Sequence, residues 1–183
     1  MADLLSHAGV NSGSFYHFFE SKEDLLKAVL QTYIQGLGPQ IVDPAYQLTI
    51  DPIERIFAIL AGYRVRILQT NCQYGCPLGR LALEIDPENR PAHALIAENF
   101  GGWIRAVRQC LVESQERLPT GVDLDALATH VLVVMEGGVM LSRSYGSVKP
   151  FDLAISQLKE HFRLLMESAT RERSRAAGRL GSK

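Results

Sequence analysis

The chain has 183 residues, enough to bury a core in one helical domain or in a small head joined to a larger body. Hydrophobic residues make up 46% of the chain and charged residues 21%, which excludes a disordered or fibrous protein. The net charge of −1 does not by itself indicate a nucleic-acid partner. The lack of a run of about 20 apolar residues and the lack of a signal-peptide layout predict a cytoplasmic protein with no membrane partner.

Apolar residues recur with a helical period along the whole chain, and no segment alternates as a strand does. We therefore predict an all-α fold. Three predicted helices have a clear N-cap residue, whose side-chain oxygen can accept from the first amides of the helix. These residues are Ser21, Asp51 and Asp123. The basic, glycine- and alanine-containing end of the chain predicts a flexible tail over 173–183. Helices are predicted at 1–8, 12–18, 22–36, 52–70, 78–85, 91–117, 123–146 and 150–172.

The first predicted elements have the layout of a helix, a tight turn and a short helix. Gly9 suits the turn because it tolerates a positive φ, and Asn11 or Ser12 can cap the short helix. We expect Val10 to fill the angle between the helices. Phe15, Phe18 and Phe19 are expected to anchor the short helix to the next one.

The other side of the short helix carries small or flat hydrogen-bonding residues, which suit close approach to phosphates and base edges in a major groove. They are Ser12, Gly13, Ser14, Tyr16 and His17. This pattern is that of a helix-turn-helix, although a capped helical hairpin also occurs in enzymes. Residues 1–35 hold four acidic side chains against Lys22 and Lys27, and because phosphate attraction dominates DNA affinity, this segment alone predicts weak binding.

Two cysteines, Cys72 and Cys76, flank a turn that precedes the helix predicted at 78–85. A helix N-terminus stabilises a thiolate, and Arg80 lies one turn further on, so Cys76 is a candidate redox-active thiol together with Cys72. The alternative is a pair of inert, partly buried cysteines. No set of four ligands for zinc accompanies them, and no histidine neighbours Cys76 as the base of a nucleophilic enzyme would. We therefore predict no metal, no cofactor and no enzyme.

The last predicted helix has an apolar seam at alternating spacings of four and three residues. The preceding helix is also broadly apolar, and its Gly137 and Gly138 permit close approach of another backbone. These surfaces predict either an intramolecular core or a four-helix bundle formed with a second copy. The seam consists of Phe151, Ile155, Leu158, Phe162, Leu165 and Ala169.

Residues 8–26 resemble the recognition region of the tetracycline-repressor (TetR) family of transcriptional regulators. The resemblance rests on Gly13-Ser14-Phe15-Tyr16-x-x-Phe19 followed by Ser21-Lys22-Glu23-x-Leu25. It implies that Ser12, Gly13, Ser14, Tyr16 and His17 lie on a recognition helix and that Lys22 contacts a phosphate. Family members begin with a further helix and the first half of the helix-turn-helix, so the head is expected to be incomplete here.

The resemblance extends to a divergent helical body with a ligand cavity and a pairing surface. It implies a remnant of the DNA-binding domain at 1–38 and an effector-binding and dimerisation domain at 39–172. Candidate cavity residues are Tyr63, Phe100, Trp103 and Met135. The cysteine segment is similar to one in a subgroup that includes regulators of reactive-electrophile responses.

These features predict a repressor that binds double-stranded operator DNA as a homodimer through its last two helices, about 123–172. An unknown small-molecule or electrophilic effector would release it. The alternative is a dimeric ligand-binding or thiol-sensing module without DNA binding.

Overall fold

The computed structural model describes residues 2–180, and these form helices and connecting turns, which confirms the all-α prediction. The α-helices are α1 (Ala2–Ala8), α2 (Ser12–Phe18), α3 (Lys22–Leu37), α4 (Asp43–Leu48), α5 (Pro52–Gln69), α6 (Pro77–Glu84), α7 (Arg90–Glu113), α8 (Leu124–Tyr145) and α9 (Lys149–Leu180). Two short elements join them, the π-helix η1 (Gly38–Val42) and the 3-10 helix η2 (Gln115–Arg117).

Three boundaries differ from the prediction. The chain continues as η1 and α4 where a turn was predicted at 36–39, because Pro39 and Pro44 occupy early helical positions, where a missing amide is tolerated. The helix predicted at 91–117 ends at Glu113, where the Ser114 hydroxyl donates to the Cys110 carbonyl oxygen at 2.7 Å. The last helix runs to Leu180, since residues 171–177 are mostly good helix formers; of the predicted tail, 181–183 lie outside the described residues.

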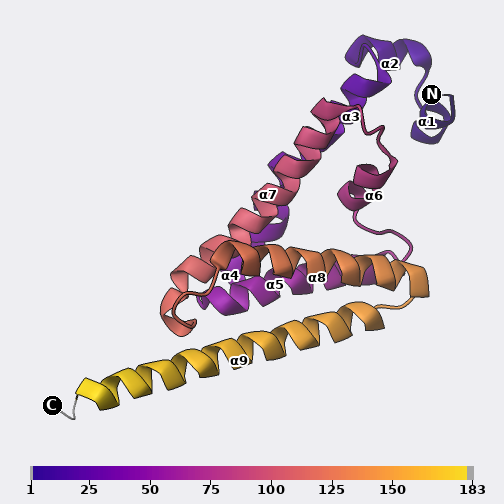
Figure 1. Cartoon of the computed structure of the whole chain (residues 1–183). Helices are drawn as coiled ribbons and strands as arrows, with labels where there is room; N and C mark the ends of the chain where they lie inside the picture. The colour runs from indigo at the N-terminus through magenta and orange to yellow at the C-terminus, as the bar shows by residue number, and fades with distance from the viewer. Residues whose placement is uncertain (1, 181–183) are drawn as a thin grey trace.

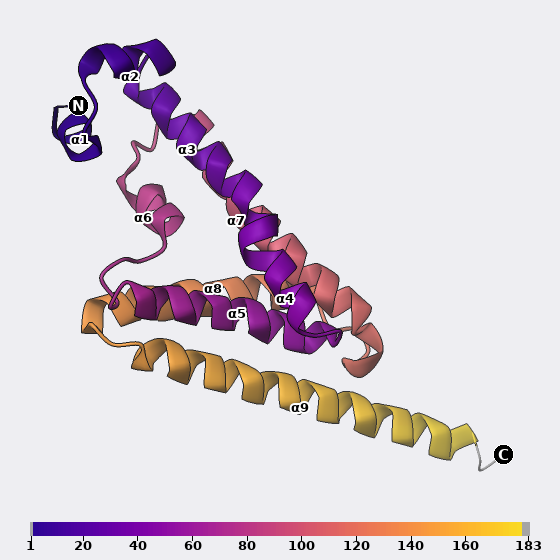
Figure 2. The ribbon, with the colours of Figure 1, turned by 180° about the vertical axis from the view of Figure 1, so that it is seen from behind.

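The helices form an arm and a base (Figures 1 and 2). In both views α3 and α7 lie side by side as the arm, α1 and α2 lie at its far end, and α5, α8 and α9 lie together as the base. The short helix α6 lies in the angle between them. The two arm helices approach closely at Gly102, where an added Cβ would lie 2.9 Å from Leu37 Cδ2. The arm therefore connects the head directly to the body.

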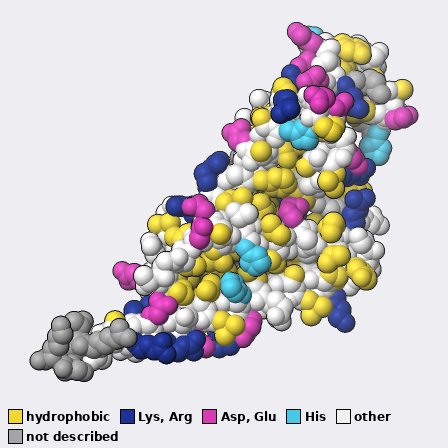
Figure 3. Space-filling model, in the orientation of Figure 1, with side chains coloured by type: hydrophobic (Ala, Val, Ile, Leu, Met, Phe, Trp, Pro, Cys, Tyr) yellow, Lys and Arg dark blue, Asp and Glu magenta, His cyan; other side chains and the backbone are white. Residues whose placement is uncertain are grey.

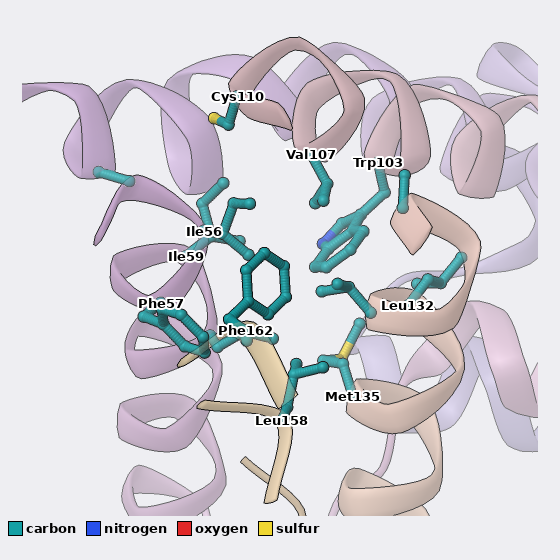
Figure 4. Packing of buried hydrophobic residues seen from close by; sticks show 14 of the residues in the cluster. Ile56, Phe57, Ile59, Trp103, Val107, Cys110, Leu132, Met135, Leu158 and Phe162 are labelled. Atoms are coloured by element: carbon teal, nitrogen blue, oxygen red, sulfur yellow. The ribbon is translucent and has the colours of Figure 1, made fainter. Parts of the chain in front are cut away.

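The main core lies where α5, α7, α8 and α9 meet. Phe162 points into its centre (Figure 4), and its ring packs edge-on against Phe57 at a centroid distance of 5.5 Å. The seam of α9 lies on this inner side: Phe151, Leu158, Phe162 and Ala169 are buried, and Ile155 and Leu165 are half-buried. The intramolecular interpretation of the seam is therefore confirmed. Although α8 is long and apolar enough to cross a membrane, eight of its residues are buried within the fold, as in a core helix.

The packing of α8 on α9 depends on Gly138. A Cβ added there would lie 3.0 Å from Phe151 Cδ2 and 3.2 Å from the Phe151 backbone Cα, whereas a Cβ at the neighbouring Gly137 would meet no atom within 4 Å.

We expect Gly138→Ala to lower the free energy of unfolding by about 1–3 kcal/mol, because the α9 backbone has to move. Gly62→Ala, at an exposed position of α5 where an added Cβ also meets no atom within 4 Å, should instead leave it unchanged or raise it by up to about 1 kcal/mol, since alanine favours a helix over glycine. Urea denaturation of both variants measures this. Equal stabilities would contradict the close approach.

Candidate functional site

A turn and two N-caps position α2 in the head. Gly9 adopts a φ of +66° between α1 and α2. Asn11 caps α2 by accepting from the Ser14 amide at 2.8 Å. Ser21 caps α3 by accepting from the Asp24 amide at 3.1 Å. The predicted capped pair of helices is therefore present, and α3 begins four residues after α2 ends.

The residues predicted to contact DNA are all exposed, and they lie on α2 and at the start of α3. The exposed fraction of Tyr16 is 57%. Their role in binding DNA stays a prediction. They are Ser12, Gly13, Ser14, Tyr16, His17 and Lys22.

Two apolar residues of the head lie differently from the prediction. Phe15 is buried, and its ring packs against that of Phe19 at 5.6 Å, but Phe18 is 74% exposed. The ring of Phe18 contacts the ring of His17 and not the following helix. Helix α2 has only seven residues, and Phe15 is its one buried residue. Val10 is 45% exposed and does not fill the angle between α1 and α2.

The charge of the head is lower than the count of its basic residues implies. Lys27 lies 3.7 Å from both Glu23 and Asp24, so its charge is largely engaged within α3. Lys22 is exposed beside α2 and takes part in no ion pair among the described residues. It is the basic side chain of the head best placed to meet a phosphate.

A cavity of about 290 Å³ lies between the arm and the base. Residues of α3, η1, α5, α6, α7 and α8 and of the loop before α6 line it. All four residues predicted for an effector pocket lie in this lining, although nothing shows a ligand in contact with them. They are Tyr63, Phe100, Trp103 and Met135.

The cavity wall contains one acidic group, Glu136, which was not among the residues predicted for the pocket. It is half-buried, and its carboxylate lies beside Cys76 and Gly79 at the start of α6. Burial raises the pKa of the Glu136 carboxyl, and the neighbouring Cys76 thiol partly opposes that rise. Its signal in the sequence is a lone carboxylate inside the apolar run 131–139.

The two candidate thiols lie in different environments. Cys72 is buried in the main core, at the end of a turn in which Asn71 and Cys72 both adopt positive φ. Cys76 is half-buried in the cavity wall and caps α6 by accepting from the Gly79 amide at 3.4 Å.

The amides at the N-terminus of α6 favour the Cys76 thiolate, as predicted, but larger effects oppose them. Burial, followed by the negative charge of Glu136, raises the pKa of Cys76 to about 12 and outweighs the amide hydrogen bonds. Arg80 does not offset this, since its guanidinium pairs with Glu84 at 2.7 Å. Cys76 is therefore a protonated thiol at neutral pH.

Alkylation of Cys76 tests this assignment. With iodoacetamide near neutral pH, we expect a rate more than about tenfold below that of the urea-unfolded chain, because an ordinary thiol has a pKa of about 8.5. The rate should keep rising with pH beyond about 9, and Glu136→Gln should accelerate it by removing a nearby negative charge. Mass spectrometry of the Cys76 peptide follows the reaction. A rate that levels off at or below the ordinary pKa would contradict the raised value.

Helix α3 joins the head to the cavity. It begins at Lys22, beside α2, and four residues of its other half line the cavity: Thr32, Tyr33, Gly36 and Leu37. Midway, Leu30 is fully buried in a second cluster with Ala92 and Ile96 of α7, against which residues of α6 also pack. The buried Asn99 amide of α7 donates to the Leu30 carbonyl oxygen at 3.1 Å. Helix α3 therefore links the cavity to the turn that follows α2.

The outer side of α8 and α9 carries a second, largely exposed surface. We call it the α8–α9 face; it consists of Ala126, His130, Val133, Gly137, Met140, Leu153, Gln157, His161 and Leu164. The His130 and His161 rings lie 6.0 Å apart, so the two antiparallel helices present one continuous face. Val133 is 61% exposed and Met140 59%. Figure 3 shows histidine and hydrophobic side chains gathered over these helices.

Comparison with known proteins covers both parts of the chain. Residues 52–158, more than half of the chain, match the family model described as the tetracyclin repressor-like C-terminal domain. Residues 1–29 match the family model described as bacterial regulatory proteins of the tetR family. The HTH-type transcriptional repressor DhaR of Mycobacterium sp. (strain GP1) is 28% identical over 152 residues, which are 82% of this chain and 75% of that protein.

Solved structures share the fold at low identity. The regulatory protein TetR from Rhodobacter sphaeroides matches with a TM-score of 0.80 and 22% identity, over 87% of this chain and 86% of that one. Escherichia coli NemR in its reduced form matches with a TM-score of 0.71 and 22% identity, over 87% of this chain and 84% of that one. The arm and base are thus the arrangement of these regulators.

Proposed function

The chain belongs to the TetR family of transcriptional regulators, and we propose on that premise that it is a cytoplasmic repressor that binds operator DNA as a homodimer and is released by a small-molecule effector. As a member of this family it is a DNA-binding regulator and not an enzyme. In this proposal residues 1–38 serve DNA binding, and residues 39–172 bind the effector and form the dimer.

The observation that carries the proposal is the continuity of α3. One helix begins four residues after α2 ends and forms a cavity wall at its other end. Recognition helices of a dimer have to match half-sites one DNA turn apart, so a small change in the tilt of α3 is sufficient to end the match. Effector binding in the cavity and operator binding by α2 are then coupled through this helix.

The α8–α9 face supports the dimer. Soluble monomers rarely expose a contiguous apolar surface of this kind, and two helices paired with their copies form a four-helix bundle. The ends of the face are bordered by charged residues such as Glu160 and Arg163, which pair with each other at 2.6 Å and fit a polar rim. A two-fold axis through this face would leave both α2 helices free to meet one duplex.

A second candidate is a thiol-sensing module that reacts with electrophiles through Cys76, with or without DNA binding. The position of Cys76 in the cavity wall favours it. Its raised pKa opposes it, because the thiolate is the reactive form. If an electrophile relieves repression, Cys76→Ser should abolish that response and leave operator binding intact, while Cys72→Ser, which changes a core thiol, serves as the control.

Footprinting tests the main proposal. The chain should protect a two-fold symmetric site in the DNA upstream of its own gene or a neighbouring one. The two half-sites should lie about 10 base pairs apart or a multiple of that distance. A hundredfold excess of non-specific DNA should not displace the protein from this site. Binding that shows no preference for any sequence, or none at all, would contradict an operator-binding repressor.

A further inference from the structure

Glu136 is a carboxylate without a counter-ion. It lies in a wall formed mainly by apolar and aromatic side chains, and in the described residues no lysine or arginine forms an ion pair with it. Its Oε2 lies against α6, where a Cβ added to Gly79 would be only 2.9 Å away. Its neighbour on α6 is the neutral Cys76 thiol, and the hydrogen bonds of the described residues give the carboxylate no charged donor. A partly buried carboxylate with no counter-ion is costly unless a partner of opposite charge arrives.

Two arginines near the cavity do not supply that partner. Arg66 belongs to the lining, but it is exposed and donates to the Gln40 carbonyl oxygen of η1 at 3.1 Å. The Arg143 side chain reaches the loop before α6, where its Cδ would lie 3.6 Å from a Cβ on Gly75. Both guanidinium groups thus lie toward solvent, and the carboxylate inside remains unpaired.

The rest of the wall suits a cation as well. Five aromatic rings line the cavity, and those of Tyr63 and Trp103 meet edge-on at a centroid distance of 6.2 Å. Ring faces attract organic cations, most strongly where water is excluded. The other three rings are Tyr33, Tyr74 and Phe100.

We propose that the cavity takes a small organic cation, a quaternary ammonium or protonated amine on an apolar body, with Glu136 as its counter-ion. This inference rests on the proposed function of the cavity as the effector site. An anionic ligand would meet the carboxylate with like charge. A neutral apolar ligand would displace water and leave the carboxylate desolvated and unpaired, so both bind less tightly than the cation.

Trp103 allows a direct test, because it is the only tryptophan of the chain and lies in the cavity wall. Its fluorescence is titrated with benzyltrimethylammonium and with neopentylbenzene, which has the same shape with carbon in place of the charged nitrogen. We expect the cation to bind the wild-type chain at least about tenfold more tightly than its neutral isostere. This comparison requires no variant and is independent of any folding defect.

Two variants assign the preference to the carboxylate. Glu136→Gln keeps the size of the side chain and should reduce the preference for the cation to less than about threefold. Cys76→Ala removes the neighbouring thiol but keeps the carboxylate, so it should retain the preference. Circular dichroism checks that both variants fold.

The outcomes separate this inference from the proposed function. Equal affinity for the two probes, no binding of the cation at millimolar concentration, or an unchanged preference in Glu136→Gln each overturns the cation inference. The neutral probe binding with equal affinity would still leave the cavity as a ligand site. Operator release is measured separately by gel shift: a cation that binds with the stated preference yet leaves operator affinity unchanged contradicts only the effector role of the cavity.

Discussion

Tyr16→Ala should abolish specific operator binding while leaving the fold intact. Tyr16 is 57% exposed on α2, so its removal creates no cavity in the core. Loss of one base-edge or phosphate contact costs about 1–3 kcal/mol, and a dimer loses it in both half-sites, for a total of about 2–6 kcal/mol. This corresponds to at least a thirtyfold loss of affinity at the lower bound. A gel shift at fixed salt with the footprinted operator measures it.

The control truncates another exposed side chain far from the head. Ile50, between α4 and α5, is 90% exposed, and Ile50→Ala should bind operator as the wild type does. Both variants should unfold at the wild-type urea midpoint, since neither side chain is buried. If Tyr16→Ala retained wild-type affinity for the operator, α2 would not be the recognition helix.

Signals carried by neighbouring residues predicted much of the fold. Asn11, Ser21, Asp51 and Asp123 cap the helices that follow them, because an N-cap needs only a side-chain oxygen within reach of the next amides. Gly9 adopts the positive φ predicted for the first turn. Such signals are complete within a few residues, so the sequence alone reveals them.

Features that depend on distant parts of the chain were predicted less well. The outward position of Phe18 could not be inferred, because a two-turn helix buries only the side that another element covers. The pKa of Cys76 depends on Glu136, which lies 60 residues further along the chain and meets it only in the folded state. The α9 seam was identified, but only the fold shows that it faces inward and that another set of residues faces outward.

The cavity was predicted in part from the sequence. Its four predicted residues were taken from a family resemblance and not from periodicity, and the fold brings them together from α5, α7 and α8. Glu136 lies one residue after Met135 and was not predicted to line the cavity. A lone acid in an apolar helix becomes a candidate ligand-binding group only once the facing wall is known to lack a lysine or arginine that pairs with it.

The second prediction with a large expected effect concerns the homodimer. Val133→Glu should convert the dimer into a monomer of about the chain mass of 20.3 kDa and thereby eliminate operator binding. Val133 lies centrally in the α8–α9 face, in which no residue carries a permanent positive charge. A two-fold axis brings the two new carboxylates into one apolar interface, and burying unpaired charge costs several kcal/mol per group.

Sedimentation equilibrium measures the mass, and a gel shift measures the loss of operator affinity. Val65→Glu is the matched control, since Val65 is a half-exposed valine in the middle of α5, outside the α8–α9 face. It should remain dimeric. Because a monomer contacts only one half-site, DNA binding by Val133→Glu should fall with the dimer population and recover when chain concentration is raised. A dimeric Val133→Glu would place the pairing surface elsewhere, and α2 would then have to meet DNA about a different two-fold axis.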